Sequence, residues 1–216
     1  MKLSEYVRIL VRRGWLMLLL AAIAGGSAYT LSKGQDPVYR SSQLVLVQPS
    51  RTDFGLAEAS RSLLEPLVVY LNSEIRAEQV IETLQLDMTP GQLKSSVTIA
   101  SDKFRMVIQI DVDNADGEVA NRIASAWGQV LVDYRNEQNQ LVRREDRVNA
   151  LLVDYPRYHQ QSPKPKINAI AGAILGFLVG AAMVFVMEYL ESSIIRRNED
   201  LERMVEIPVL ASIPPF

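Results

Sequence analysis

The sequence predicts a small α+β domain, a mixed sheet packed on long helices, held between two transmembrane helices. Two uncharged runs predict the membrane helices: residues 14–32, 19 in number, and residues 167–187, 21 in number. A helix needs about 20 apolar residues to cross the hydrocarbon core of a bilayer. Residues 34–164, between the runs, alternate strand and helix patterns, and their number is ordinary for one domain.

Basic residues beside the two runs predict the orientation of the chain. Four of them precede the first run, against one acidic residue: Lys2, Arg8, Arg12 and Arg13, against Glu5. Because cytoplasmic flanks carry the excess of Lys and Arg, we expect a multi-pass protein of the cytoplasmic (inner) membrane with both termini in the cytoplasm. The expected segments are a cytoplasmic N-terminus 1–13, spans 14–32 and 167–187, an extracytoplasmic domain 33–166 and a cytoplasmic tail 188–216.

A cleaved signal peptide is the alternative for the first run. Basic residues precede residues 15–24, and Gly26-Ser27-Ala28 resembles a small-residue cleavage site. In that case the second run would be the one remaining anchor.

The first half of the middle domain predicts one strand and two helices. Residues 38–48 are rich in β-formers and end at Pro49, which indicates a strand. Residues 56–71 carry apolar side chains at helical spacing, with Pro66 expected to kink or break the helix. The helical pattern returns over residues 74–86.

The second half predicts a sheet and a long helix. Thr89-Pro90 is a helix start, a hydroxyl cap followed by proline, and residues 97–100 and 105–112 are predicted strands. Residues 113–117 are expected to cap a long helix, whose apolar stripe is Val119, Ile123, Trp127, Val130 and Tyr134. The polar residues 135–147 indicate a solvated extension or a face toward another subunit, and residues 151–155 are a candidate last strand.

Composition argues against several classes of function. Residues 34–164 hold 14 basic and 18 acidic residues, a net charge of −4, which argues against nucleic-acid binding. The chain has no cysteine and one histidine, His159, expected in a solvated linker. Asp111, Asp113 and Asp116 lie close together but lack the spacing of a calcium loop, so a helix-capping turn is the better interpretation. We therefore expect no catalytic residues, no metal and no cofactor.

Prolines and glycines mark the second span. Pro156, Pro163 and Pro165 lie in a stem, residues 156–166, that leads into it. Gly172, Gly176 and Gly180 recur four apart within it, on one helix face. Small residues at this spacing let helices approach closely in lipid, so we expect a contact face toward the first span, which has Gly25 and Gly26, or toward a neighbouring subunit.

The order of these segments resembles the chain-length determinant (Wzz-type) family of polysaccharide co-polymerases over nearly the whole chain. The pieces that carry the resemblance are VYRSSQLVLVQPS, VIETLQLDMTPGQL, DVDNADGEVANRIASAWGQVLVDY and the proline-rich second span. The resemblance implies a membrane ring of identical subunits that modulates the length or export of O-antigen, capsule or exopolysaccharide, with a polymerase or exporter and the polysaccharide as partners beside membrane lipids. Few residues separate the long helix from the second span, which argues against the tall helical arm and the ruler mechanism of long-chain regulators.

The tail resembles the linker to a cytoplasmic tyrosine-kinase domain in fused co-polymerases. The matching residues are Glu199, Asp200, Pro208, Val209, Pro214 and Phe216. No phosphate-binding loop occurs in the chain, so the resemblance implies a short adaptor, without enzymatic activity, that docks on and activates a separate tyrosine kinase.

Two other functions compete with this one. The first is a two-span membrane sensor with an external ligand-binding domain, although its tail is short for a signalling output. The second is an enzyme acting on glycan, which would need two carboxyl groups flanking the bond that is cleaved, and the sequence identifies no such pair.

Overall fold

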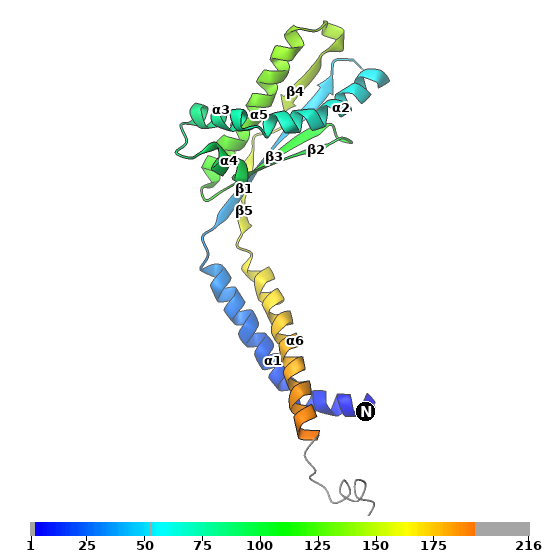
Figure 1. Cartoon of the computed structure of the whole chain (residues 1–216), viewed down its shortest axis with the longest axis vertical. Helices are drawn as coiled ribbons and strands as arrows, with labels where there is room; N and C mark the ends of the chain where they lie inside the picture. Colours follow the sequence, from blue (N-terminus) through cyan, green and yellow to red (C-terminus); the bar gives the residue numbers. More distant parts are fainter. Residues whose placement is uncertain (1–2, 52, 193–216) are drawn as a thin grey trace, which may run out of the picture. The chain divides into compact units, whose positions relative to one another are not determined.

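The structure is a computed structural model of the chain, and it describes residues 3–51 and 53–192. The chain divides into two compact units. One holds the long helices α1 (Leu3–Lys33) and α6 (Pro165–Ser192), which run antiparallel side by side in Figure 1. The other comprises residues 35–163 and is a mixed helix and sheet domain.

A five-stranded antiparallel sheet forms one layer of the second unit. Its strands are β1 (Val38–Pro49), β2 (Val97–Asp102), β3 (Val107–Asn114), β4 (Val148–Leu152) and β5 (Arg157–Ser162). The order is β2-β3-β1-β4, and β5 also pairs with β1, beyond the end of β4. The long strand β1 therefore holds the sheet together.

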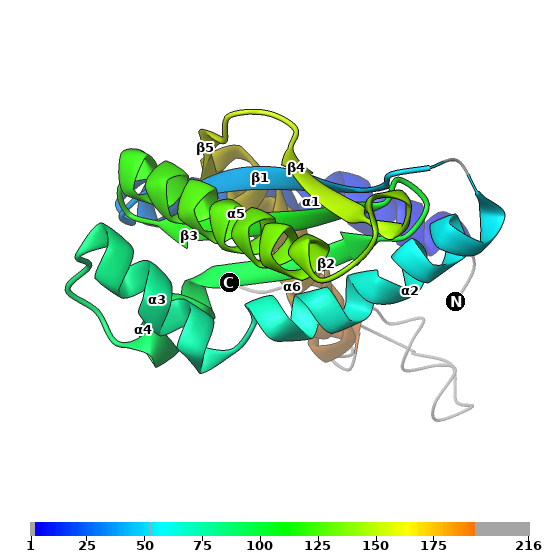
Figure 2. The same ribbon diagram turned by 90° about the horizontal axis from the view of Figure 1, so that it is seen from above.

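Helices cover one face of this sheet, as Figures 1 and 2 show. They are α2 (Phe54–Leu71), α3 (Glu74–Leu84), α4 (Pro90–Ser96) and α5 (Gly117–Gln140); a single 3-10 turn, Arg144–Asp146, precedes β4. The core lies between the two layers, with Trp127 of α5 fully buried at its centre. The indole N–H of Trp127 donates to the carbonyl of Leu71, 3.2 Å away, so the ring's one polar group is satisfied.

The first strand and helix predicted from the sequence are confirmed, with one correction. Pro66 does not break α2, which runs unbroken from Phe54 to Leu71. Proline leaves the carbonyl four residues earlier without its helical partner, and here that residue, Ser62, is exposed like Pro66 itself. Water can satisfy the carbonyl, so the helix tolerates the proline.

Both predicted helix starts are confirmed. Thr89 accepts a hydrogen bond from the Gln92 backbone N–H while the Gln92 side chain accepts one from the Thr89 N–H, a reciprocal capping box. Asp116 caps α5 by accepting hydrogen bonds from the N–H groups of Glu118 and Val119. The long helix therefore begins at Gly117, as the aspartate turn predicts.

Residues 135–147, predicted as a solvated extension or a face toward another subunit, are only partly exposed. Arg135 and Asn139 are buried, and both donate to the carbonyl of Val148 at the start of β4. Burial lowers the pKa of Arg135, because the surrounding protein disfavours its charge. These two polar side chains face inward because the Val148 carbonyl of β4 accepts a hydrogen bond from each of them.

The last strands also differ from the prediction. The candidate strand at residues 151–155 begins earlier, at Val148, and ends at Leu152. Residues 157–162, expected within a proline-rich stem, form β5 and pair with residues 38–42. The strand is polar apart from Tyr158 and largely exposed, as suits an edge strand, and it has no alternation of apolar and polar residues that would reveal it in the sequence.

Candidate functional site

The two long helices form the first candidate site. Within the described residues, each has a stretch long and apolar enough to cross a membrane: Arg12–Lys33 in α1 and Pro165–Leu190 in α6. Gly172, Gly176 and Gly180 all lie on the side of α6 that faces α1. A methyl group added at Gly176 would lie 2.6 Å from the Leu20 carbonyl oxygen and 2.6 Å from the Ala24 Cβ. Glycine is therefore what lets the two backbones approach this closely.

The first helix contributes a matching close contact. A Cβ added at Gly25 would lie 3.0 Å from the Ala169 carbonyl oxygen, whereas one at Gly26 would have no heavy atom within 4 Å. In this structure the glycine face of α6 is thus occupied by α1 of the same chain. A contact of these glycines with a neighbouring subunit stays a prediction.

Polar contacts join the helices at both ends of the pair. At one end the Asn168 amide donates to the Ser32 hydroxyl, 2.8 Å away. At the other end Arg13 and Glu188 form an ion pair with 3.8 Å between nitrogen and oxygen. Sequence analysis missed both pairs, although single polar residues at the ends of apolar runs are the signal that could have found them.

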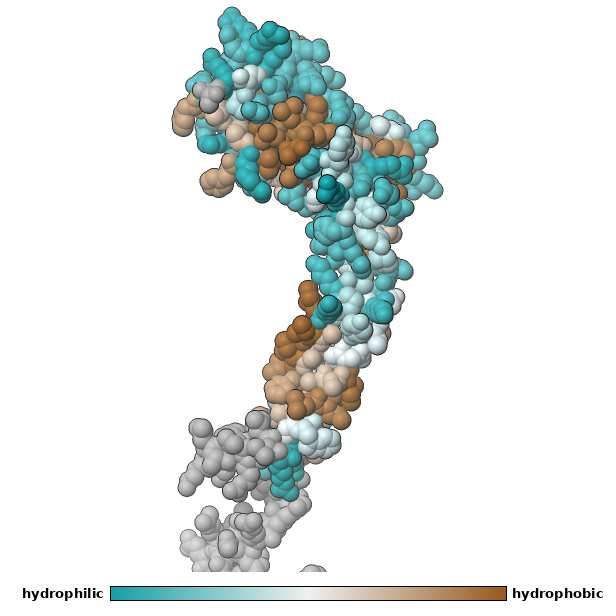
Figure 3. Space-filling view, turned by 180° about the vertical axis from the view of Figure 1, so that it is seen from behind, coloured by the Kyte–Doolittle hydropathy of each residue, from teal (hydrophilic) through white to brown (hydrophobic). Residues whose placement is uncertain are grey.

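The second candidate site is the face of the sheet without helices. Alternation along β1 turns Val45 and Val47 toward the helices and Leu44 and Leu46 toward the opposite side. Figure 3 shows an apolar patch on this side of the unit, surrounded by polar residues. An uncovered apolar patch of this kind commonly marks an interaction surface.

The three aspartates near the start of α5 have structural partners. Asp113 forms a bidentate pair with Arg40, at 2.7 and 2.6 Å, which raises the pKa of the Arg40 guanidinium. Asp111 accepts hydrogen bonds from Ser42 and Gln109, and Asp116 caps the helix. Within the described ranges, residues 3–51 and 53–192, no three acidic or histidine side chains are grouped to hold a metal ion.

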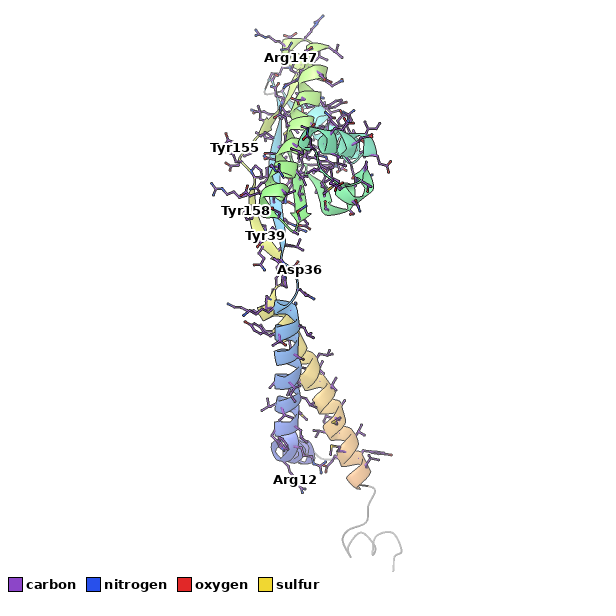
Figure 4. The ribbon with its side chains drawn as sticks, turned by 90° about the vertical axis from the view of Figure 1, so that its left-hand side faces the viewer. Arg12, Asp36, Tyr39, Arg147, Tyr155 and Tyr158 are labelled. Atoms are coloured by element: carbon purple, nitrogen blue, oxygen red, sulfur yellow. The ribbon has the colours of Figure 1, made fainter. Side chains whose placement is uncertain are left out.

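The predicted stem residues are spread over three places. Pro156 precedes β5, Pro163 follows it and Pro165 is the first residue of α6. His159 is an exposed residue of β5 paired with Arg40. Figure 4 shows Tyr155 and Tyr158 on the β4–β5 side of the unit, and the Tyr158 ring meets Tyr39 edge to face, with 5.7 Å between the centroids.

The predicted docking residues of the tail, Glu199 to Phe216, lie outside the described residues. Of the predicted site residues, the structure therefore brings together the three glycines alone. The arrangement offers a helix pair of membrane length and an apolar protein surface.

Known proteins resemble this chain over almost its full length. The chain is 25% identical to "Probable capsular polysaccharide biosynthesis protein YwqC" of Bacillus subtilis. The matched region covers 98% of this chain and 86% of that protein. It is 23% identical to capsular polysaccharide type 5 biosynthesis protein cap5A of Staphylococcus aureus (99% and 94%) and to capsular polysaccharide biosynthesis protein CpsC of Streptococcus pneumoniae (97% and 92%). No protein-family model matches the chain. None of these names describes a catalytic activity.

Proposed function

We propose that the chain regulates the chain length or export of a capsular or extracellular polysaccharide, because almost all of it matches capsular polysaccharide biosynthesis proteins. The observation that carries this proposal is that the chain matches these relatives over almost their whole length, and that all of their names refer to capsular polysaccharide biosynthesis. The described structure supports a regulatory role, since it offers membrane-length helices and an interaction surface. The two-span sensor is not favoured by these relatives.

The proposal includes a topology: α1 and α6 span the cytoplasmic membrane and residues 35–163 lie outside it. Two observations support it. Both helices have the length and composition of spans, and the excess of basic residues before the first span favours a cytoplasmic N-terminus. Because α1 and α6 pack antiparallel, the start of α1 and the end of α6 would lie on one side of the membrane.

Cysteine labelling tests this topology, because the chain has no cysteine of its own. Lys103→Cys, in the loop after β2, should react with a membrane-impermeant maleimide in intact cells. Ser4→Cys should react only after the cells are opened. The reverse pattern would contradict the proposed orientation.

The proposal also includes a partner, a separate cytoplasmic tyrosine kinase that docks on residues 191–216. It is supported by the resemblance of the tail to the linker of fused co-polymerases. We propose that the chain has no catalytic activity of its own and acts as a homo-oligomeric ring beside a polysaccharide polymerase or exporter.

Complementation tests both parts of the function. A strain lacking this chain should regain polymer of normal length when it carries the whole chain. A chain without Arg197–Phe216 should insert in the membrane but leave the partner kinase unphosphorylated on tyrosine. Unchanged kinase phosphorylation would overturn the adaptor role, and unchanged polymer in the strain without the chain would overturn the regulatory role.

A further inference from the structure

The open face of the sheet carries a continuous apolar patch. Strand register places Leu46 beside Leu151, and the Val153 N–H donates to the Leu44 carbonyl, 3.1 Å away. Side chains of paired residues lie on the same face, and Leu151 and Val153 are each 50% exposed. We call Leu44, Leu46, Leu151 and Val153 the sheet patch. Tyr155, 91% exposed, follows it in the chain and lies on the same side in Figure 4.

Charges around the sheet patch are balanced. On the same face, Asp113 is paired with Arg40 and Asp111 accepts hydrogen bonds from Ser42 and Gln109. Arg157 pairs with Ser42, two residues before Leu44 of the patch, and is exposed. The face therefore holds bonded carboxylates and an exposed arginine around an apolar centre.

The opposite side of the unit is formed by the outer sides of α2 and α3. Val69 is 72% and Ile75 is 66% exposed there, while the neighbouring Leu67 and Leu71 point into the core. Four acidic residues lie on the same two helices, Glu65, Glu74, Glu78 and Glu82; Glu65 is paired with Lys103, and Arg76 lies over the Tyr70 ring. This helix side thus offers two apolar side chains within a mainly acidic surface.

We propose that the sheet patch of one copy packs on the outer side of α2 and α3 of a neighbouring copy of this chain. This contact deepens the proposed homo-oligomer by naming its surfaces. The two sides complement each other in charge, because Arg157 is exposed beside the sheet patch and Glu74, Glu78 and Glu82 are exposed on the helix side. Two helix sides facing each other would instead repel.

The geometry of the contact determines the assembly. The two surfaces lie on opposite faces of the same unit, so the contact is head to tail, and such contacts close into a ring when the rotation permits. The glycine face of α6 is already occupied by α1. We therefore place this contact between copies in the globular unit.

Disulfide cross-linking of the full chain in its native membrane tests the contact. A double variant, Leu151→Cys with Ile75→Cys, should form a ladder of cross-linked dimers, trimers and larger species on mild oxidation. Either single variant should stay monomeric. The control pair, Leu151→Cys with Asn136→Cys, places the second thiol at an exposed position of α5 and should give no ladder.

A charge placed in the patch gives a second measurement. Leu151→Glu should lower the native mass in detergent to that of one 24.2 kDa chain. The matched control is Val142→Glu, because Val142 is 44% exposed against 50% for Leu151 but lies after α5, outside the patch. Circular dichroism of both variants checks that the fold is kept.

Other outcomes would overturn the contact. Cross-linked dimers from Leu151→Cys alone would show two sheet faces packed on each other. An unchanged native mass for Leu151→Glu with altered polymer would show that the patch binds another protein or the polysaccharide. In both cases the complementation experiment still reports separately on the proposed function, because it does not depend on Leu151.

Discussion

The side chain of Asn139 gives Val148, the first residue of β4, the two backbone hydrogen bonds that a neighbouring strand would otherwise supply. Its amide donates to the Val148 carbonyl, 3.0 Å away, and its side-chain oxygen accepts from the Val148 N–H, 3.1 Å away. Val148 is buried, so water cannot take over these bonds. Together with Arg135, which also donates to the Val148 carbonyl, Asn139 closes the edge of the sheet here.

Replacement of Asn139 by Ala should therefore destabilise the protein. It leaves the Val148 N–H without a partner, which costs about 1–3 kcal/mol, and each kcal/mol lowers the melting temperature by about 2–4 °C in a chain of this size. Thermal unfolding followed by tryptophan fluorescence measures the shift. Asn136→Ala, at an exposed position on the same helix, should leave the melting temperature unchanged; an equal drop would argue against the strand-like role.

A second residue, Asp102, makes stability depend on pH. It accepts hydrogen bonds from the backbone N–H and the side chain of Arg105 and from the backbone N–H of Phe104, and these bonds lower its pKa. A lowered pKa in the folded state means that the stabilisation is present above the ordinary Asp pKa of about 4. It is lost as the pH falls through the lower folded value.

Asp102→Asn should thus melt at a lower temperature than the unchanged protein at pH 7. The difference should shrink as the pH falls below about 4, because the unchanged protein then loses the same charge. Melting curves from pH 7 to pH 3 measure it. A difference that stays constant with pH would assign the effect to packing.

At the scale of elements, the contact between α1 and α6 depends on small residues. Gly176→Leu places a side chain where the Leu20 carbonyl and Ala24 now lie, so it should separate the helices. Gly26→Leu is the control, because Gly26 faces open space.

A disulfide between Ser32→Cys and Asn168→Cys, which replace a 2.8 Å hydrogen bond, measures the separation. Its yield should fall with Gly176→Leu and stay unchanged with Gly26→Leu. An unchanged yield with Gly176→Leu, together with a lower native mass in detergent, would instead assign this glycine to a contact between chains.

Elements with strong local patterns could be predicted from the sequence, and those fixed by distant partners could not. β1, the capped starts of α4 and α5 and the Trp127 stripe follow from propensity, capping and periodicity. β5 is a strand because Tyr158 and His159 pair with β1, more than 100 residues earlier in the chain. The inward side chains Arg135 and Asn139 likewise depend on β4, which their own helix pattern does not contain.

At the scale of the whole molecule, one candidate site could be predicted from the sequence and the other could not. The glycine face could be predicted from its spacing, because one helix carries all three residues. The sheet patch could not, because β1 and β4 bring Leu46 and Leu151 together from opposite ends of the domain. Pairing across the chain is therefore what creates the proposed contact surface.

One consequence of the sheet concerns how the domain could be handled outside a membrane. Val38 pairs with Ser162, so residues 35–163 begin and end on adjacent strands, about 5 Å apart. A few linking residues could join these ends into a circle, or graft the domain into a surface loop of a carrier protein, since adjacent termini favour such insertions. The two long helices and the lipid around them would then be absent, and self-association of the domain could be measured in simple aqueous buffer.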